Sequence, residues 1–305
     1  MDMLTFEGQP FAVPAFRIIA IVDGETGDER ALQCHGRIYA LFEASFGADA
    51  KVASYHFDRH KGRFAWMKPS LVAEGRRFFT RGRFAFTDGI RRYGMVPEAF
   101  DNPALPYFGI ENRRGMTGLE LALPIDAGNI GFAMDMLDAL GGAPVIWGVM
   151  GYGFFVPPYK RSLAFMLGQA SRRYRTAIEI WVKMVDEGIR REGSYYRWKE
   201  GEEPGIGDVG WHTLVGREFW PRLPADLDSQ AAAARVAVTR GPDVLTLTAG
   251  PRPIWGDVQA GEDIAAYRAA AALLRPIRFP AGCGHVSMFN GDHPDRVDAY
   301  LARFD

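Results

Sequence analysis

Hydrophobic residues follow two spacings along the chain, one typical of strands and one typical of helices. Short runs rich in β-branched and aromatic residues, bounded by Gly, Asp or Pro, predict strands. Longer stretches in which apolar residues recur every three or four positions predict helices. The expected strands are residues 16–22, 51–57, 63–68, 107–112, 118–123, 145–156 and 244–248. The expected helices are residues 28–46, 71–79, 129–140, 163–174, 263–274 and 295–304.

Single residues mark where several of these helices begin and end. Ser70 stands where a serine side chain can cap the first turn of a helix. Gly47 follows the first expected helix, where a terminating glycine is common, and Pro276 stops the alanine-rich one. Strands and helices mix without strict alternation along the chain. The pattern therefore predicts an α+β fold with a mixed, largely antiparallel sheet packed with helices, and not a parallel doubly wound sheet.

One stretch, residues 187–208, departs from this pattern. Acidic residues and glycines dominate it, and Tyr195, Tyr196 and Trp198 lie among them. We expect a surface excursion, a loop that lies over the fold. Strands and helices resume after it, and a length of 305 residues fits one large domain. We therefore expect residues 1–305 to form a single domain.

The charge balance argues against direct contact with nucleic acid. The chain has 36 Lys and Arg against 37 Asp and Glu, a formal net charge of −1. A nucleic-acid binder usually needs a basic excess, because phosphate contacts dominate its affinity. The local cluster of Arg172, Arg173 and Arg175 is more typical of an exposed helix face.

The chain also lacks the signals of export and of membrane insertion. Its acidic start, Met1-Asp2, has no basic region followed by an apolar core. No uncharged apolar run is long enough to form a membrane-spanning helix. The two cysteines, Cys34 and Cys283, do not make a disulfide framework and fit a reducing compartment. We expect a cytoplasmic protein that does not contact a membrane.

Three local patterns resemble chemical sites, but each lacks a part that the chemistry needs. Residues 148–153 are glycine-rich after a strand, yet no helix start follows to bind phosphate, so a bulged or bent buried strand is expected. His56 and His60 would bind zinc together on a helix, but at a strand end this spacing separates them by about 13 Å. Cys283 near His285 can activate a thiolate, although the glycines between and before them favour a loop. We expect no metal and no cofactor.

The most distinctive run is Ala-Gly-Pro-Arg-Pro-Ile-Trp-Gly-Asp at residues 249–257. Proline fixes the backbone, glycine permits positive φ, and aspartate can cap local amides. A rigid, shaped loop is one interpretation. The other is a binding loop that presents Trp255 and Asp257 to a partner, since tryptophan is favoured at interface hot spots.

Several separated pieces in about the last hundred residues resemble the type VI immunity family, which was first catalogued as a domain of unknown function. The pieces are residues 210–216 (Gly-Trp-His-Thr-Leu-Val-Gly), 249–257, 267–268, 274–278 and 300–305. Tyr300 stands where the family has tryptophan, and the first 200 residues match only in layout. Members of this family are encoded beside toxins of polymorphic and type VI secretion systems, often nucleases of restriction-endonuclease-like fold. The resemblance therefore implies an immunity protein that neutralises a cognate toxin.

The resemblance does not identify contact residues, so we infer them from their chemistry. A nuclease toxin has a basic, phosphate-reading cleft, which acidic and aromatic side chains of an inhibitor can fill. The expected partner-binding residues are Trp198, Glu200, Glu202, Glu203, Trp255 and Asp257. An ordinary solvated loop remains the alternative for the acidic stretch.

Two other functions compete with toxin binding. A hydrolase-type enzyme would need titratable groups that converge on one pocket, for which Asp257, His212 and His285 are the best candidates. A structural or adaptor subunit of the secretion machinery would expose large apolar patches. We expect no enzymatic activity, and we leave the oligomeric state open.

Overall fold

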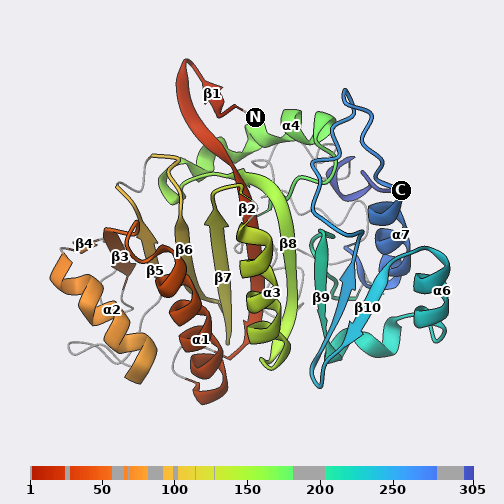
Figure 1. The fold of residues 1–305 in the computed structure, drawn as a ribbon, viewed down its shortest axis with the longest axis horizontal. Helices are drawn as coiled ribbons and strands as arrows, with labels where there is room; N and C mark the ends of the chain where they lie inside the picture. The colour runs from red at the N-terminus through yellow and green to blue at the C-terminus, as the bar shows by residue number, and fades with distance from the viewer. Residues whose placement is uncertain are drawn as a thin grey trace.

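The fold is built on one antiparallel sheet. The structure is a computed structural model, and it describes residues 2–24, 28–56, 65–67, 69–81, 92–98, 102–113, 115–126, 128–180, 203–279 and 299–305. Within these ranges, strands pair in the order β10-β11-β9-β8-β2-β7-β6-β5-β3-β4, and β1 pairs with the outer part of β2 (Figure 1). The strands are β1 (Leu4–Phe6), β2 (Gln9–Asp23), β3 (Val52–His56), β4 (Ala65–Met67), β5 (Arg92–Val96), β6 (Tyr107–Arg113), β7 (Met116–Leu123), β8 (Val145–Phe155), β9 (His212–Gly216), β10 (Ala237–Arg240) and β11 (Val244–Thr248). The expected α+β class and antiparallel sheet are confirmed.

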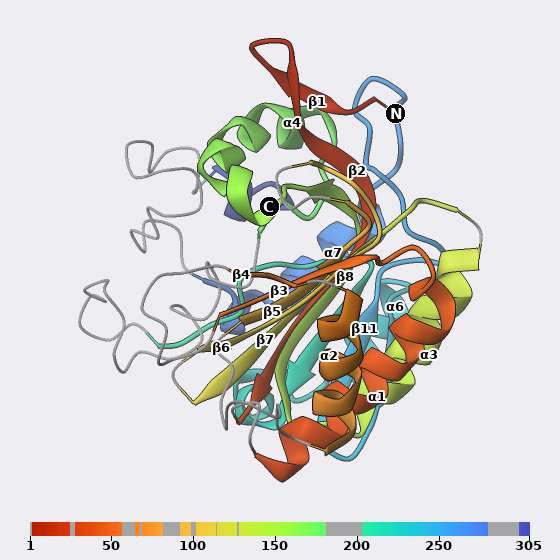
Figure 2. The same ribbon diagram turned by 90° about the vertical axis from the view of Figure 1, so that its left-hand side faces the viewer.

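The helices pack against this sheet and at its ends. They are α1 (Glu29–Phe46), α2 (Pro69–Arg81), α3 (Gly128–Gly141), α4 (Leu167–Arg173), α6 (Leu227–Ala233) and α7 (Ala265–Leu273), with the 3-10 helices η1 (Pro158–Met166), η2 (Arg217–Arg222) and η3 (Arg275–Ile277). Helices α1, α2 and α3 lie together along one face of the sheet (Figure 2). No helix in the described ranges is long and apolar enough to cross a membrane.

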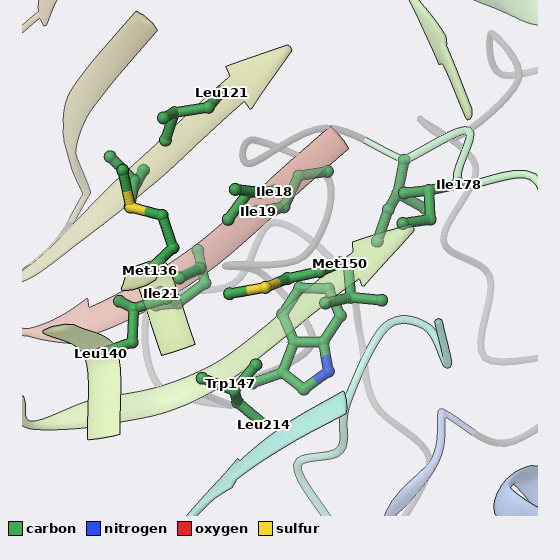
Figure 3. Close-up of a cluster of buried hydrophobic side chains, with 14 of the residues drawn as sticks. Ile18, Ile19, Ile21, Leu121, Met136, Leu140, Trp147, Met150, Ile178 and Leu214 are labelled. Carbon is green, nitrogen blue, oxygen red and sulfur yellow. The ribbon is translucent and has the colours of Figure 1, made fainter. Parts of the chain in front are cut away.

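The core is centred on β2, which pairs with β7 on one edge and β8 on the other. Residues 15–22 of β2 are all buried, so both faces of this strand are covered although successive side chains point in opposite directions. Figure 3 shows Ile18, Ile19 and Ile21 of β2 meeting side chains from β7, β8 and α3. A strand covered on both faces has a continuous apolar sequence, which is why this strand is recognisable.

Most predicted elements are confirmed, with differences at their boundaries. Helix α2 starts at Pro69, so Ser70 lies in its first turn and does not cap it. The stretch expected as one helix over 163–174 divides into η1 and α4. Residues 299–301 are helical at the end of the chain, and the beginning of the helix expected over 295–304 lies outside the described residues. The short strands β1, β5, β9 and β10 were not anticipated.

The glycine-rich residues 148–153 lie inside β8 and do not form a phosphate-binding loop. They pair in regular register with β2, and the irregularity in this pair lies further along, between Ile21 and Val22. Gly153 pairs with Ile178 outside the main sheet, and a Cβ on Gly153 would lie 2.3 Å from the Ile178 carbonyl oxygen. The glycine therefore permits a close approach between two backbones.

The last residues of the stretch expected as a surface excursion over 187–208 are not at the surface, and residues 187–202 lie outside the described residues. Residues 205–208 are buried, and Ile206 pairs with Arg278. Asp208 is 4% exposed, so it is not one of the solvated acidic residues of that segment. Local acidic composition led to the wrong prediction here, because only tertiary contacts show that Asp208 has a buried basic partner.

Candidate functional site

The 249–257 loop is fixed by backbone hydrogen bonds to the chain just after α4. Arg175 N donates to Gly256 O at 3.1 Å and Val258 N donates to Arg173 O at 3.0 Å. Gly256 has φ +62°, and a Cβ there would lie within 3.0 Å of Thr176 atoms. Positive φ and this close approach both require glycine, so the loop has one defined shape.

Trp255 lies on an aromatic cluster at the C-terminal end of β8. Its ring is stacked on Tyr152, with centroids 5.3 Å apart and planes 24° apart. Phe154 at 5.2 Å and Tyr174 at 5.5 Å complete the cluster. Trp255, Tyr152 and Tyr174 are each only partly buried. The loop therefore supports a partly exposed tryptophan on rigid aromatic neighbours.

Asp257, the second residue expected to bind a partner, has an intramolecular partner. Arg173 of α4 donates from Nε at 3.0 Å and from Nη2 at 2.8 Å to its carboxylate, and Gln259 N donates at 2.9 Å. The hydrogen bonds from Arg173 are the main reason that the pKa of Asp257 lies below its usual value. In this conformation Asp257 orders the loop and holds it to α4.

His212 lies in β9, where burial lowers its pKa from 6.5 to about 4. Its Nδ1 lies 2.9 Å from Thr248 Oγ1, and its ring neighbours Trp211. Among the described residues, no hydrogen bond or ion pair joins His212 to Asp257. His285, the third residue of the hydrolase alternative, lies outside the described residues. Within the described residues, the structure therefore does not join His212 and Asp257 in a common site.

Of the glutamates expected to bind a partner, only Glu203 is described. Its side chain is 65% exposed and lies 3.0 Å from Arg222 of η2. Trp198, Glu200 and Glu202 lie outside the described residues, as do His60 and Cys283. Glu203 is therefore an exposed carboxylate beside η2.

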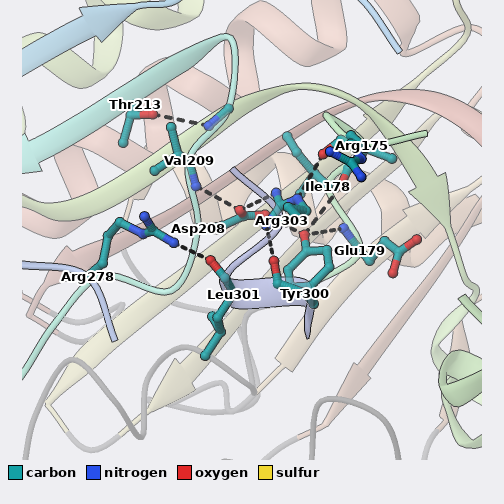
Figure 4. A network of polar contacts seen from close by, with 12 residues as sticks. Arg175, Ile178, Glu179, Asp208, Val209, Thr213, Arg278, Tyr300, Leu301 and Arg303 are labelled. Atoms are coloured by element: carbon teal, nitrogen blue, oxygen red, sulfur yellow. Dashed lines mark hydrogen bonds and ion pairs between the residues drawn. The ribbon is translucent and has the colours of Figure 1, made fainter. Parts of the chain in front are cut away.

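A buried polar centre around Asp208 was not anticipated (Figure 4). Arg303 donates to Asp208 Oδ1 at 2.5 Å, and the Tyr300 hydroxyl donates to Oδ2 at 2.6 Å. Glu179 N donates to the Tyr300 hydroxyl at 3.0 Å. Burial raises the pKa of Tyr300 well above its usual value, so the phenol stays protonated and can donate. These bonds join three segments that lie far apart in the sequence.

A second buried ionic group also contacts the segment of residues 175–180. Arg17 of β2 contacts Glu120 of β7 at 2.6 Å and donates to Ile178 O at 2.8 Å. Arg161 of η1 contacts the other oxygen of Glu120. The segment 175–180 is therefore held by charged groups from both the sheet and the end of the chain. Nothing in the local sequence indicates either group, because the partners are more than forty positions apart.

The pieces that resemble the type VI immunity family lie together in space. Ala249 N donates to Trp211 O at 2.7 Å, which joins the loop to the 210–216 piece. The rings of Tyr267 and Phe304 are stacked 6.0 Å apart, and Arg278 contacts Asp305 at 2.9 Å. The shared pattern therefore marks one packed unit, of which the Trp255 loop is a partly exposed part.

Comparison with known proteins shows the fold. No protein-family model and no curated protein matches the chain. A similar solved structure is the Pseudomonas aeruginosa T6SS protein PA0821, where T6SS denotes the type VI secretion system. The likeness has a TM-score of 0.76 at 16% sequence identity, and covers 99% of this chain and 86% of that chain. At this identity, the two proteins share an architecture.

Proposed function

We propose that this protein is an immunity protein of a type VI or related secretion system, which binds and neutralises a cognate toxin and has no enzymatic activity. The observation that carries the proposal is the convergence of the family-like pieces on the unit that holds Trp255. A solved protein of the type VI secretion system with the same architecture supports the same assignment.

The Trp255 loop has the properties of a binding surface. Aromatic side chains contribute large contact areas, and hot spots are enriched in tryptophan. Because backbone bonds to Arg173, Arg175 and Thr176 already order the loop, little conformational entropy is lost when a partner binds. We assign Trp255 to direct contact, and Asp257 to holding the loop in shape through Arg173.

The acidic segment that ends at Glu203 provides the charge for a basic partner. A nuclease toxin has a positively charged cleft, and complementary charge raises the association rate. Trp198, Glu200, Glu202 and Glu203 are the residues we assign to this contact. Glu203 is available because its own side chain is 65% exposed, and ion pairs with an exposed partner contribute little.

The experiment is co-expression and co-purification with the toxin encoded beside this gene. We expect the two proteins to form a complex and the cell to be protected. The triple variant Glu200→Lys, Glu202→Lys, Glu203→Lys should weaken the complex and the protection without lowering Tm. The matched control reverses three other exposed acids, Asp126, Asp135 and Asp138. Protection that persists without any physical complex would contradict the proposal.

A further inference from the structure

The segment of residues 175–179 is hydrogen-bonded to the Trp255 loop, residues 249–257, and also to side chains of residues 300–303. We propose that Tyr300 and Arg303 are positioning residues, which hold the Trp255 loop in shape through this segment. The inference deepens the proposed function, because its consequence for partner binding rests on the assignment of Trp255 to the contact. Its structural part does not depend on that assignment.

On the loop side, three donors of the segment bind carbonyl oxygens of the loop. Arg175 N donates to Gly256 O at 3.1 Å, and Thr176 N donates to Trp255 O at 3.2 Å. The Thr176 hydroxyl donates to Ile254 O. These three consecutive carbonyls belong to the residue that carries the indole and to its two neighbours. The position of the segment therefore fixes the backbone from which the Trp255 side chain projects.

On its other side, the segment contacts Arg303 and Tyr300 (Figure 4). Arg303 Nε donates to Arg175 O at 2.9 Å. Glu179 N donates to the Tyr300 hydroxyl at 3.0 Å, and this hydroxyl lies 3.3 Å from Ala177 O. Arg175 thus accepts from Arg303 with its carbonyl and donates to the loop with its amide. The path from Arg303 to the loop passes through this single residue.

Arg303 and Tyr300 are themselves fixed by Asp208. Arg303 Nη2 donates to Oδ1 of the carboxylate at 2.5 Å, and the Tyr300 hydroxyl donates to Oδ2 at 2.6 Å. The side chain of Arg303 is 6% exposed and that of Asp208 is fully buried. Charge-assisted hydrogen bonds are stronger than neutral ones, and a low local dielectric strengthens them further. The segment is therefore held from this side by a firm, buried support.

Another contact between the loop and α4 is more exposed. Arg173 and Asp257 form an ion pair there, but the side chain of the arginine is 45% exposed. Exposed pairs contribute little, because water and salt compete for the charges. We therefore expect the order of the Trp255 loop to depend more on the hydrogen bonds of residues 175–176 than on this ion pair.

The middle of the segment has independent support. Ile178 N donates to Tyr152 O of β8 at 2.9 Å, and Arg17 donates to Ile178 O at 2.8 Å. A change of Arg303 should therefore leave Ile178 in place and act on Arg175, whose carbonyl it binds. The expected effect is a local loosening beside the loop, without loss of the fold.

The test is amide hydrogen exchange of the full ¹⁵N-labelled chain, without any partner. Arg303→Lys keeps a cation beside Asp208 and removes the Nε donor to Arg175 O. We expect the exchange of the Arg175 and Thr176 amides to rise about five-fold, as for loss of one hydrogen bond. Tyr300→Phe is the second variant, in case the first does not fold, and it should raise exchange at these amides and at that of Glu179.

The matched control is Ile38→Val, which removes one buried methyl group in α1. Helix α1 lies at the bottom of Figure 1 and α4 at the top. Each protein is measured equally far below its own Tm, so that loss of global stability cancels. We expect the control to leave the Arg175 and Thr176 rates at their parent values.

A second measurement follows the indole itself. In protein labelled with 5-fluorotryptophan, the ¹⁹F resonance of Trp255 is assigned by its loss in Trp255→Phe. We expect Arg303→Lys and Tyr300→Phe to shift or broaden this resonance, and Ile38→Val to leave it unchanged. A purely structural role of the two residues would lower Tm without moving the Trp255 signal.

Two results would overturn the proposal. The first is equal exchange of the Arg175 and Thr176 amides in the control and in each folded variant of Tyr300 or Arg303. The second is a Trp255 resonance that none of these variants changes. Toxin affinity is a separate outcome, which should fall several-fold in the same variants because a looser loop loses more entropy on binding. Unchanged affinity beside the expected exchange and resonance changes would remove Trp255 from the contact and leave the positioning role standing.

Discussion

The indole of Trp255 lies stacked on the phenol of Tyr152, with ring centroids 5.3 Å apart. This contact joins a loop near the end of the chain to the strand β8 beside the centre of the sheet. It places a partly exposed tryptophan on a support that belongs to the core. The same pair therefore connects the stability of the fold with the surface that we assign to partner binding.

Replacing Trp255 separates these two roles. Its ring is only partly covered, so truncation should cost less than it would for a fully buried tryptophan. We expect Trp255→Ala to lower the free energy of unfolding by about 2 kcal/mol. Trp255→Phe keeps an aromatic ring on Tyr152 and should cost less. Urea denaturation measures both. If the two variants were equally stable, the stacking contact would not contribute as we infer.

The buried centre around Asp208 should dominate stability near the end of the chain. Arg303→Met leaves the Asp208 carboxylate buried without its cation. Removal of one member of a buried pair costs about 3–5 kcal/mol. Tyr300→Phe removes the hydroxyl that donates to Asp208, and loss of one such hydrogen bond should cost on the order of 1 kcal/mol.

An exposed ion pair provides the control for these two variants. Arg240→Ala breaks the pair that Arg240 forms with Asp228 at the surface. We expect this change to cost less than about 1 kcal/mol. Chemical denaturation should therefore rank Arg303→Met as the most destabilised variant and Arg240→Ala as the least. Equal losses for Arg303→Met and Arg240→Ala would show that the buried pair has no special weight.

Two buried histidines should make the fold sensitive to acid. Burial lowers the pKa of both His35 and His212 from 6.5 to about 4. The unfolded chain then binds protons below about pH 6.5, while the folded chain does not until about pH 4. The stability contributed by each neutral histidine is therefore fully present above pH 6.5 and falls as pH decreases toward 4. The slope for each group is at most about 1.4 kcal/mol per pH unit.

Substitution of one histidine tests this slope. His35→Leu places an apolar side chain of similar size in the core and removes one titrating group. Between pH 6.5 and 4.5, the stability of the variant should fall less steeply than that of the parent. Parallel curves for the two proteins would show that His35 titrates alike in the folded and unfolded states.

Two glycines in different surroundings should respond to alanine in opposite directions. A Cβ at Gly153 would lie 2.3 Å from the backbone oxygen of Ile178, so Gly153→Ala must move one backbone. Overpacking of this kind costs about 1–3 kcal/mol. Gly131 is exposed in α3 with open space around its Cβ position. Gly131→Ala should therefore stabilise the protein by about 0.5–1 kcal/mol. Thermal melts compare the two variants directly, and a destabilised Gly131→Ala would contradict the helix-propensity argument.

The sequence by itself determined the elements whose pattern is local. The largely apolar run 16–22 became the centre of β2, because a strand covered on both faces is apolar at nearly every position. The helical spacing over 28–46 became α1, because periodicity reports which face of a helix is buried. The antiparallel pair 107–112 and 118–123 was also predictable, since a short connection leaves adjacent strands few other ways to pair. Short strands such as β9 and β10 carry too few positions for a period to stand out.

Only the tertiary structure decided what the polar residues do. Asp208 was predicted on an acidic surface and is instead buried against Arg303, and Asp257 was predicted to face a partner and pairs with Arg173. Composition shows that a carboxylate is present. Its charge is solvated, neutralised or available to a partner according to which cation the fold brings within a few ångströms, because electrostatic interaction depends on distance and burial and not on sequence order.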